Sequence, residues 1–457
     1  MGGGWKRWIV SGAMLAACLL VSGCSFKLAA SPDDLYSLPQ LPAEYTELNS
    51  CINALLSNGA EYAAPVSGSN TQSVQIVDLD GDGQEEALAF LRNSAEEKPL
   101  KIYIFSPTGE GYEQSAVIEG SGSAIYSISY RDLNGDGRME LLVGWKVAAD
   151  MQALSVYTQR GGQIEELVQA NYVKYAVTDL DNTSPELELV VLHADDEGSG
   201  VADLYTWDRT GPGGLGKTSS ARLSMTMAEL NSGRVTSGSL RDGTPALFVS
   251  GVSDSSVEIT DILLPKKGEL VNVVLSGTTG FTTELYRYQS LFPMDINGDG
   301  VTEVPAPEVL PTYSLQGESY EYMVDWRSYN VDGSSTSMVC TYHNNDDGWY
   351  LELPDSWINR IMVSRSQSGA EETAVTFFVR GAAEEESQGL LRIYTITGDS
   401  RDIKASRGDR FILGRQSETI YAAELLDANG SWSYGITEDE LRSCFKLITT
   451  EWRAGDN

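Results

Sequence analysis

The sequence of 457 residues has very little histidine and comparatively little basic charge. It contains 2 His residues, and 32 Lys and Arg residues stand against 65 Asp and Glu residues, for a formal net charge of -33. His193 and His343 fall in neither a metal-binding nor a triad pattern, and GxSxG, HExxH and P-loop motifs are missing. Nucleic acid would be repelled by this much negative charge. We therefore expect no nucleic-acid partner and identify no catalytic residue.

Beyond its first segment, the chain has no long apolar run. None of the later runs approaches the roughly 18 to 20 apolar residues that a membrane-spanning helix needs. The starting segment itself has Lys6 and Arg7, then WIVSGAMLAACLLV, and closes with VSGC. This order predicts a lipoprotein signal peptide over 1–23, cleaved before a lipidated Cys24. An ordinary signal peptide with an incidental cysteine is the alternative. We expect a membrane-anchored protein on the extracytoplasmic cell surface.

Cysteine is also scarce, with five in the chain. Cys18 would leave with the signal peptide, and Cys24 would carry the lipid. Cys51, Cys340 and Cys444 then remain, which permits one disulfide and one free thiol without saying which residues pair.

The segment after Cys24 predicts a tether and a helix. Three prolines indicate an extended, lipidated tether over 24–42. Apolar residues then recur at helical spacing from Tyr45 to Leu55, and Gly59 stands where a helix cap belongs. We predict an N-terminal helix over 43–58.

What the sequence has in abundance is one acidic loop, repeated. DLDGDGQEE begins at Asp78, DLNGDGRME at Asp132 and DINGDGVTE at Asp295. Each has Asp at position 1, Asp or Asn at 3, Asp at 5, Gly at 6 and Glu at 9. DLDNTSPELELVVL at Asp179 loses the central Asp-Gly, and LRDGTPALFVS near Leu240 keeps only a turn and the following strand.

A tyrosine follows three of these loops at a nearly constant distance. The separations are 25 residues from Asp78 to Tyr103, 25 from Asp132 to Tyr157 and 26 from Asp179 to Tyr205. Between these markers lie short segments rich in β-branched and aromatic residues, such as VQIVDL and AIYSISY. A unit of about 50 residues with several short strands predicts blades of a β-propeller in a mainly all-β fold.

The acidic loops have the residue types that a calcium site requires. Calcium takes six to eight oxygen ligands, and crowded carboxylates repel one another without a cation. An Asp-Gly-rich turn without metal is the alternative. These are not EF-hands, because Glu comes at position 9 rather than 12 and the flanks are strand-like. The predicted side-chain ligands are Asp78, Asp80, Asp82, Glu86, Asp132, Asn134, Asp136, Glu140, Asp295, Asn297, Asp299 and Glu303, with backbone carbonyls of Gln84, Arg138 and Val301.

On these motifs the loops resemble those of FG-GAP/VCBS repeats, the integrin-like β-propeller blades. The lipobox, the tether LYSLPQLP and the later DGWYLELPDSW resemble a group of clostridial lipoproteins that carry such repeats. The resemblance implies a β-propeller domain over 60–335 with structural Ca2+. The Asp179 and Leu240 loops depart from the pattern, which leaves metal binding there in doubt.

The end of the chain departs from the repeat. Alternating segments after about residue 336 predict a smaller β-rich domain over 336–457, and Thr437 with Glu440 predicts a capping box for a short final helix. Trp349, Tyr350 and Trp357 are core residues or a sugar-binding face.

Two functions remain open on this sequence. One is a non-catalytic binding or scaffold module for an extracellular glycan or protein ligand, since propellers offer rigid faces with variable loops. The alternative is an extracellular carbohydrate-directed enzyme whose carboxylates cannot be picked out among 65 acids.

Overall fold

The computed structural model describes residues 45–109, 111–208, 214–287, 289–312, 321–369, 371–382 and 386–448. The predicted signal peptide, Cys24 and the tether lie outside these residues. Within them, no helix is long and apolar enough to cross a membrane.

The chain divides into two compact units, and the smaller contains the first described helix. This unit comprises residues up to Gly59 together with Pro107–Glu113. Its helix α2 spans Thr46–Ser57, and Leu48 and Ile52, one turn apart, are its buried residues. The Sγ of Cys51 lies 3.6 Å from the carbonyl oxygen of Tyr112. Gly59 follows the helix at a φ of 95°, the left-handed conformation expected after a helix end.

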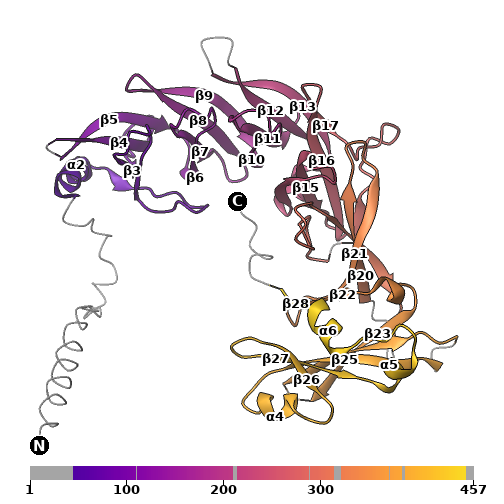
Figure 1. Ribbon diagram of the computed structural model, residues 1–457. Coiled ribbons are helices and arrows are strands. Elements are labelled where there is room, and N and C mark those ends of the chain that lie inside the picture. Colours follow the sequence, from indigo (N-terminus) through magenta and orange to yellow (C-terminus); the bar gives the residue numbers. More distant parts are fainter. Residues whose placement is uncertain are drawn as a thin grey trace, which may run out of the picture. The chain divides into compact units, whose positions relative to one another are not determined.

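The larger unit consists of sheets that follow one another in chain order (Figure 1). The first three sheets have the strand orders β1-β3-β4-β5 with β2 beside β3, β6-β7-β8-β9, and β10-β11-β12-β13. Their bounds are β1 Glu61–Tyr62, β2 Val74–Val77, β3 Glu86–Arg92, β4 Leu100–Thr108, β5 Gly111–Gly120, β6 Ala124–Arg131, β7 Glu140–Lys146, β8 Gln152–Arg160, β9 Gln163–Tyr172, β10 Lys174–Thr178, β11 Glu188–Ala194, β12 Ser199–Asp208 and β13 Gly214–Thr226.

Three more sheets follow in the described part of the chain. Their orders are β14-β15-β16-β17 with β18 beside β16, β19-β20-β21-β22-β28, and β23-β24-β25-β27-β26. The strands are β14 Arg234–Ser239, β15 Pro245–Val252, β16 Val257–Lys266, β17 Glu269–Asn272, β18 Leu285–Arg287, β19 Val304–Leu310, β20 Glu321–Tyr329, β21 Ser335–Asn344, β22 Trp349–Leu353, β23 Ile361–Gly369, β24 Glu372–Val379, β25 Gln388–Ile396, β26 Phe411–Arg415, β27 Ile420–Leu425 and β28 Phe445–Leu447.

Short helices connect some of these strands. They are α3 Met227–Asn231, η3 Asp355–Trp357, α4 Arg401–Ala405, α5 Asp427–Ser431 and α6 Glu438–Cys444. Thr437 and Glu440 form the predicted capping box at the start of α6. The chain then continues into β28, which pairs with β22.

The core lies between consecutive sheets, because inner strands such as β7, β11 and β15 are buried on both faces. On β7, Leu141 and Val143 pack with the first sheet, whereas Leu142 packs with the third. β11 and β15 divide their residues in the same way. Successive side chains of a strand point to opposite faces, so a continuous apolar run serves two interfaces. The prediction of a mainly β fold of blade-like repeats is confirmed.

The predicted boundary at 336 falls within β21, so the fifth sheet contains residues from both sides of it. Trp349 and Trp357 are fully buried and Tyr350 is 6% exposed, so all three belong to the core rather than to a surface. Cys51, Cys340 and Cys444 are free thiols in the structure.

Candidate metal centre

The acidic loops stand immediately before β3, β7, β11 and β19, and the first three of these strands lie inside their sheets. Glu86, Glu140 and Glu188 are the first residues of β3, β7 and β11, and Glu303 directly precedes β19. All four are buried, whereas the loop residues between the first Asp and the Glu are largely exposed. Each loop therefore has an exposed turn closed by a buried glutamate.

The aspartate at position 1 organises each complete loop. In the first loop, the Oδ1 of Asp78 accepts the Gly81 N–H at 2.8 Å and the Oδ2 accepts the Gly83 N–H at 3.0 Å. Asp132 accepts the corresponding glycine amides at 2.8 Å each, and Asp295 accepts them at 2.7 and 2.9 Å. Because the carboxylate binds its own turn, it is held at the centre of the loop.

The aspartate at position 5 also makes the same hydrogen bond in all three complete loops. The Oδ1 of Asp82, Asp136 and Asp299 accepts the N–H two residues later, at 2.8, 2.9 and 2.8 Å. The second and third loops add a contact from the Asn at position 3, whose Nδ2 donates to the position-5 carboxylate at 3.1 and 3.0 Å. These bonds keep the oxygens within one tight turn.

The glutamate at position 9 clamps the start of the loop. Its Oε2 accepts the N–H of the residue after the first Asp, at 2.9 Å from Leu79 to Glu86 and 2.9 Å from Leu133 to Glu140. Glu303 accepts from Ile296 at 3.2 Å. Burial, with the neighbouring aspartates adding to it, raises the pKa of all three carboxyls, and that of Glu303 to about 7.

One observation in the first loop and one in the third are consistent with a cation there, whereas in the second loop both oxygens of Glu140 already accept hydrogen bonds, from the Leu133 N–H and the Thr158 hydroxyl. In the first loop, ligand oxygens of Asp78, Asp80 and Glu86 all lie within 4.8 Å of one another. In the third loop, Glu303 is 0% exposed and its Oε1 is buried without a hydrogen-bond partner in the described structure. A buried carboxylate oxygen without a donor is costly. The donor set is all oxygen, which suits a hard cation such as calcium.

The Asp179 loop retains the clamp but contains one extra residue. The Leu180 N–H donates to Glu188 at 2.7 Å, so Glu188 occupies the place of the position-9 glutamate although it stands at position 10. Our fixed spacing missed Glu188. The tyrosine separation of 26 instead of 25 residues was the available signal for this insertion. Asn182, in the lengthened turn, adopts a φ of 51°.

The turn near Leu240 has lost the acidic clamp completely. The Leu240 N–H donates to the carbonyl oxygen of Thr244 at 2.8 Å, where the other loops use a glutamate. Asp242 accepts the Thr244 N–H at 3.0 Å. A backbone carbonyl therefore replaces the carboxylate, and the turn closes without a set of acidic ligands.

Successive loops are also joined to one another by backbone hydrogen bonds. The N–H of Met139, next to Glu140, donates to the Leu79 carbonyl at 2.8 Å, and the N–H of Leu187 donates to the Leu133 carbonyl at 2.9 Å. Thr302, next to Glu303, donates to Ser239 at 2.9 Å. Glu140, Glu188 and Glu303 are thus positioned partly by the preceding turn.

Comparison with known proteins gives one family match. A model of the FG-GAP-like repeat family matches residues 78–143. That range runs from the first acidic loop through the second and into β7. No curated protein matches the sequence.

Several solved structures are similar at low identity. A protein from Lactobacillus plantarum is 10% identical at a TM-score of 0.26, over 71% of this chain and 86% of that chain. The exotype rhamnogalacturonan lyase YesX is 13% identical at a TM-score of 0.24, over 67% of this chain and 59% of that chain. A triple arginine-to-alanine mutant of AofleA from Arthrobotrys oligospora is 8% identical at a TM-score of 0.24, over 74% of this chain and 90% of that chain. We draw no ligand or activity from such distant neighbours, and the conclusion is that this chain contains an FG-GAP-like repeat.

Proposed function

We propose that this protein is a cell-surface lipoprotein whose repeat loops bind calcium and whose rigid blades form a non-catalytic binding module. The lipid would be on Cys24 and the tether would hold the blades outside the membrane. The motif before Cys24 and the FG-GAP-like repeat at 78–143 support this placement. Calcium would then be structural, because extracellular calcium modules bind at about 10⁻⁴ to 10⁻³ M.

The observation that carries the calcium proposal is the unsatisfied Oε1 of Glu303. Its Oε2 accepts a hydrogen bond from the Ile296 N–H, so the other oxygen of this buried carboxylate is available to a ligand. Asp295, Asn297, Asp299 and Glu303 would hold the ion in that loop, and their counterparts in the first two loops would do the same. A bound cation supplies charge compensation for the crowded carboxylates.

Thermal unfolding of the purified protein in millimolar calcium and in EDTA tests the proposal. We expect a higher Tm with calcium, because a ligand that binds only the folded state stabilises it. Combined replacement of Asp82, Asp136 and Asp299 by Asn should remove this shift. Asn keeps the oxygen that accepts each loop amide and removes the negative charge. It gives up one exposed side-chain hydrogen bond in each loop, so the EDTA melt should change little.

A matched control uses an aspartate in a turn outside these loops. Asp195 also accepts amide hydrogens from its own turn, at 2.9 and 2.8 Å. Asp195→Asn should leave the calcium shift intact. Coincident melts of the unmodified protein with calcium and with EDTA would refute the structural calcium role.

A further inference from the structure

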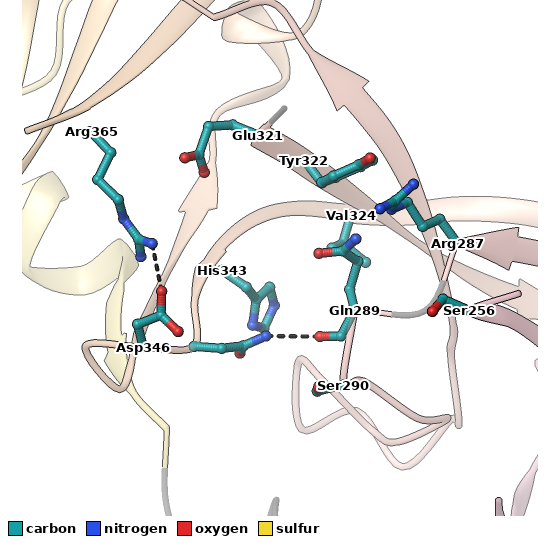
Figure 2. Close-up of a pocket in the computed structure, with 11 residues that line it drawn as sticks. Ser256, Arg287, Gln289, Ser290, Glu321, Tyr322, Val324, His343, Asp346 and Arg365 are labelled. Atoms are coloured by element: carbon teal, nitrogen blue, oxygen red, sulfur yellow. Dashed lines mark hydrogen bonds and ion pairs between the residues drawn. The ribbon is translucent and has the colours of Figure 1, made fainter. Parts of the chain in front are cut away.

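A polar cavity of about 440 Å³ lies beside the fifth sheet, far along the chain from the first two acidic loops. Residues of β18, β20, β21 and β23 line it, together with the connections after β15, β18 and β21 (Figure 2). Such a volume is within the range of small-molecule sites, about 300 to 1,000 Å³. Its lining consists mainly of charged, amide and hydroxyl groups.

One wall of the cavity presents an uncompensated positive charge. The guanidinium carbon of Arg287 lies 5.6 Å from the ring centroid of Tyr322. Arg287 makes no ion pair with the residues that the structure describes, although acids outnumber basic residues two to one in the chain. Stacking on an aromatic ring holds a guanidinium in place while leaving its N–H donors available. This wall is suited to a carboxylate.

The opposite wall presents acids that are already held in position. Asp346 pairs with Arg365 at 2.6 Å, and Glu321 accepts the Tyr342 hydroxyl at 2.8 Å. Figure 2 shows Glu321, Arg365 and Asp346 together on the side away from Arg287. A carboxylate fixed by one partner retains lone pairs for further donors. Such oxygens can accept hydrogen bonds from ligand hydroxyls.

Two serines of the lining adopt an unusual backbone conformation. Ser256 and Ser290 both have a φ of 57°, the left-handed region that residues other than glycine seldom adopt. Both line the same cavity. Glycine would adopt this conformation with less strain, so a serine here retains a hydroxyl at a cost in stability.

Contacts hold two further lining side chains, His343 and Asn345, in position. The His343 ring stacks on Tyr350 with centroids 5.0 Å apart and planes 7° from parallel. The Asn345 Nδ2 donates to the Gln289 carbonyl at 2.8 Å, which joins the connection after β21 to the one after β18 (Figure 2). A cavity already formed before binding loses little conformational entropy when a ligand enters.

We propose that this cavity binds an acidic saccharide, with the sugar carboxylate on Arg287 and sugar hydroxyls on Glu321, Asp346 and the two serines. The chain's net charge of -33 does not prevent this, because charges beyond about 8 to 10 Å are screened at physiological salt. The guanidinium in contact therefore determines the local interaction. This inference rests on the proposed binding-module function and specifies its ligand class.

Calorimetric titration of the purified protein in millimolar calcium tests the proposal. The probes are digalacturonate and a glucuronate-containing disaccharide, the neutral disaccharide of each, and sodium sulfate. We expect at least one uronate disaccharide to bind at least tenfold more tightly than its neutral analogue. Equal binding of the neutral sugars, sulfate binding as tight as the uronates, or failure of both uronates at millimolar concentration would each overturn the assignment.

Arg287→Gln should weaken uronate binding by about tenfold to a hundredfold, the usual loss for a hydrogen bond between charged groups. Arg407→Gln is the matched control, since Arg407 is exposed between α4 and β26. It should leave binding unchanged. Equal affinity of Arg287→Gln and the unmodified protein would contradict the role of this wall.

The serines provide a readout that a merely structural role would not produce. Ser256→Gly and Ser290→Gly should raise the Tm while weakening uronate binding, because each relaxes the backbone and removes a hydroxyl. Asn359→Gly, at an exposed residue with a φ of 63° outside the cavity, should raise the Tm without affecting binding. Unchanged binding in both serine variants would remove them from the site.

The two proposals fail separately. If calcium leaves the Tm unchanged but uronates still bind through Arg287, the metal role is wrong and the saccharide site holds. If calcium raises the Tm and uronates fail to bind, the calcium loops hold and the saccharide site is wrong.

Discussion

The Glu188 carboxylate accepts the backbone N–H of Leu180 at 2.7 Å, across a loop that lacks the central Asp-Gly of the complete loops. The clamp therefore persists where the calcium pattern does not. This separates two roles of the position-9 glutamate, closing the turn and completing a ligand set. We expect only the first role in the Asp179 loop.

Glu188→Ala should destabilise the fold by about 1 to 3 kcal/mol, because it leaves a buried amide without an acceptor. The loss should be equal in calcium and in EDTA, whereas Glu303→Ala should cost more in calcium. Glu188→Gln is the control, since its amide oxygen can still accept the Leu180 N–H. Urea unfolding in both buffers measures the differences, and a calcium-dependent loss for Glu188→Ala would mean that this loop binds metal too.

Gly81 and Gly83 give a second comparison within one loop. Their φ values are 73° and 84°, so alanine is strained at both. A Cβ on Gly81 would lie 2.4 Å from the Gly137 carbonyl oxygen, whereas a Cβ on Gly83 meets no atom within 4 Å. Gly83→Ala should cost about 1 to 2 kcal/mol from backbone strain.

Gly81→Ala should cost a further amount of about 1 to 3 kcal/mol, because two backbones must separate. Chemical denaturation of the two variants side by side checks this. Similar losses would show that the first and second loops are not in close contact.

Glu371 and Glu372 are neighbours in sequence with different surroundings. Glu372 pairs with Arg410 through both oxygens, at 3.0 and 3.3 Å, and the side chains are 7% and 12% exposed. Glu371 pairs with Lys404 at 3.0 Å but is 51% exposed. We expect Glu372→Ala to cost about 3 to 5 kcal/mol, because it leaves a buried guanidinium unpaired.

Glu371→Ala should cost less than about 1 kcal/mol, since exposed pairs contribute little. The difference in denaturation midpoint between the two variants measures the effect of burial. Comparable midpoints would indicate that water reaches Arg410.

His343 should make stability depend on pH. Part of the residue is exposed, but both ring nitrogens are buried, and burial lowers its pKa to about 3. The pKa of a histidine in the unfolded chain is about 6.5. Between about pH 6.5 and about pH 3, His343 is therefore protonated in the unfolded chain but not in the folded chain. Stability from this residue is therefore present above that window and falls as the pH falls through it, by up to about 1.4 kcal/mol per pH unit.

His343→Phe can keep the stacking on Tyr350 while removing the titration. Its stability should fall less steeply below pH 6.5 than that of the unmodified protein. Unfolding measured at several pH values in EDTA gives the two slopes without any contribution from bound calcium. Parallel slopes would contradict the assignment to His343.

The repeat could be predicted because its signals are local. The aspartate at position 1 binds amides three and five residues later, and Thr437 and Glu440 cap α6 within one turn. Such contacts depend on residues a few positions apart, so spacing alone predicts them. The separation of 26 residues from Asp179 to Tyr205 even indicated the inserted residue, although the fixed loop pattern missed Glu188.

The tertiary structure decided the features that depend on packing between distant segments. The fifth sheet crosses residue 336 because β20 pairs with β21, and no composition change marks that pairing. Arg287, Glu321 and Arg365 reach one cavity from three strands, and nothing in their sequence spacing relates them. The sequence by itself determined the acidic turns, the α6 cap and the strand-rich composition, since each rests on neighbours along the chain. Which turn contacts the next, and which charges share a cavity, followed only from how the buried faces of successive sheets pack together.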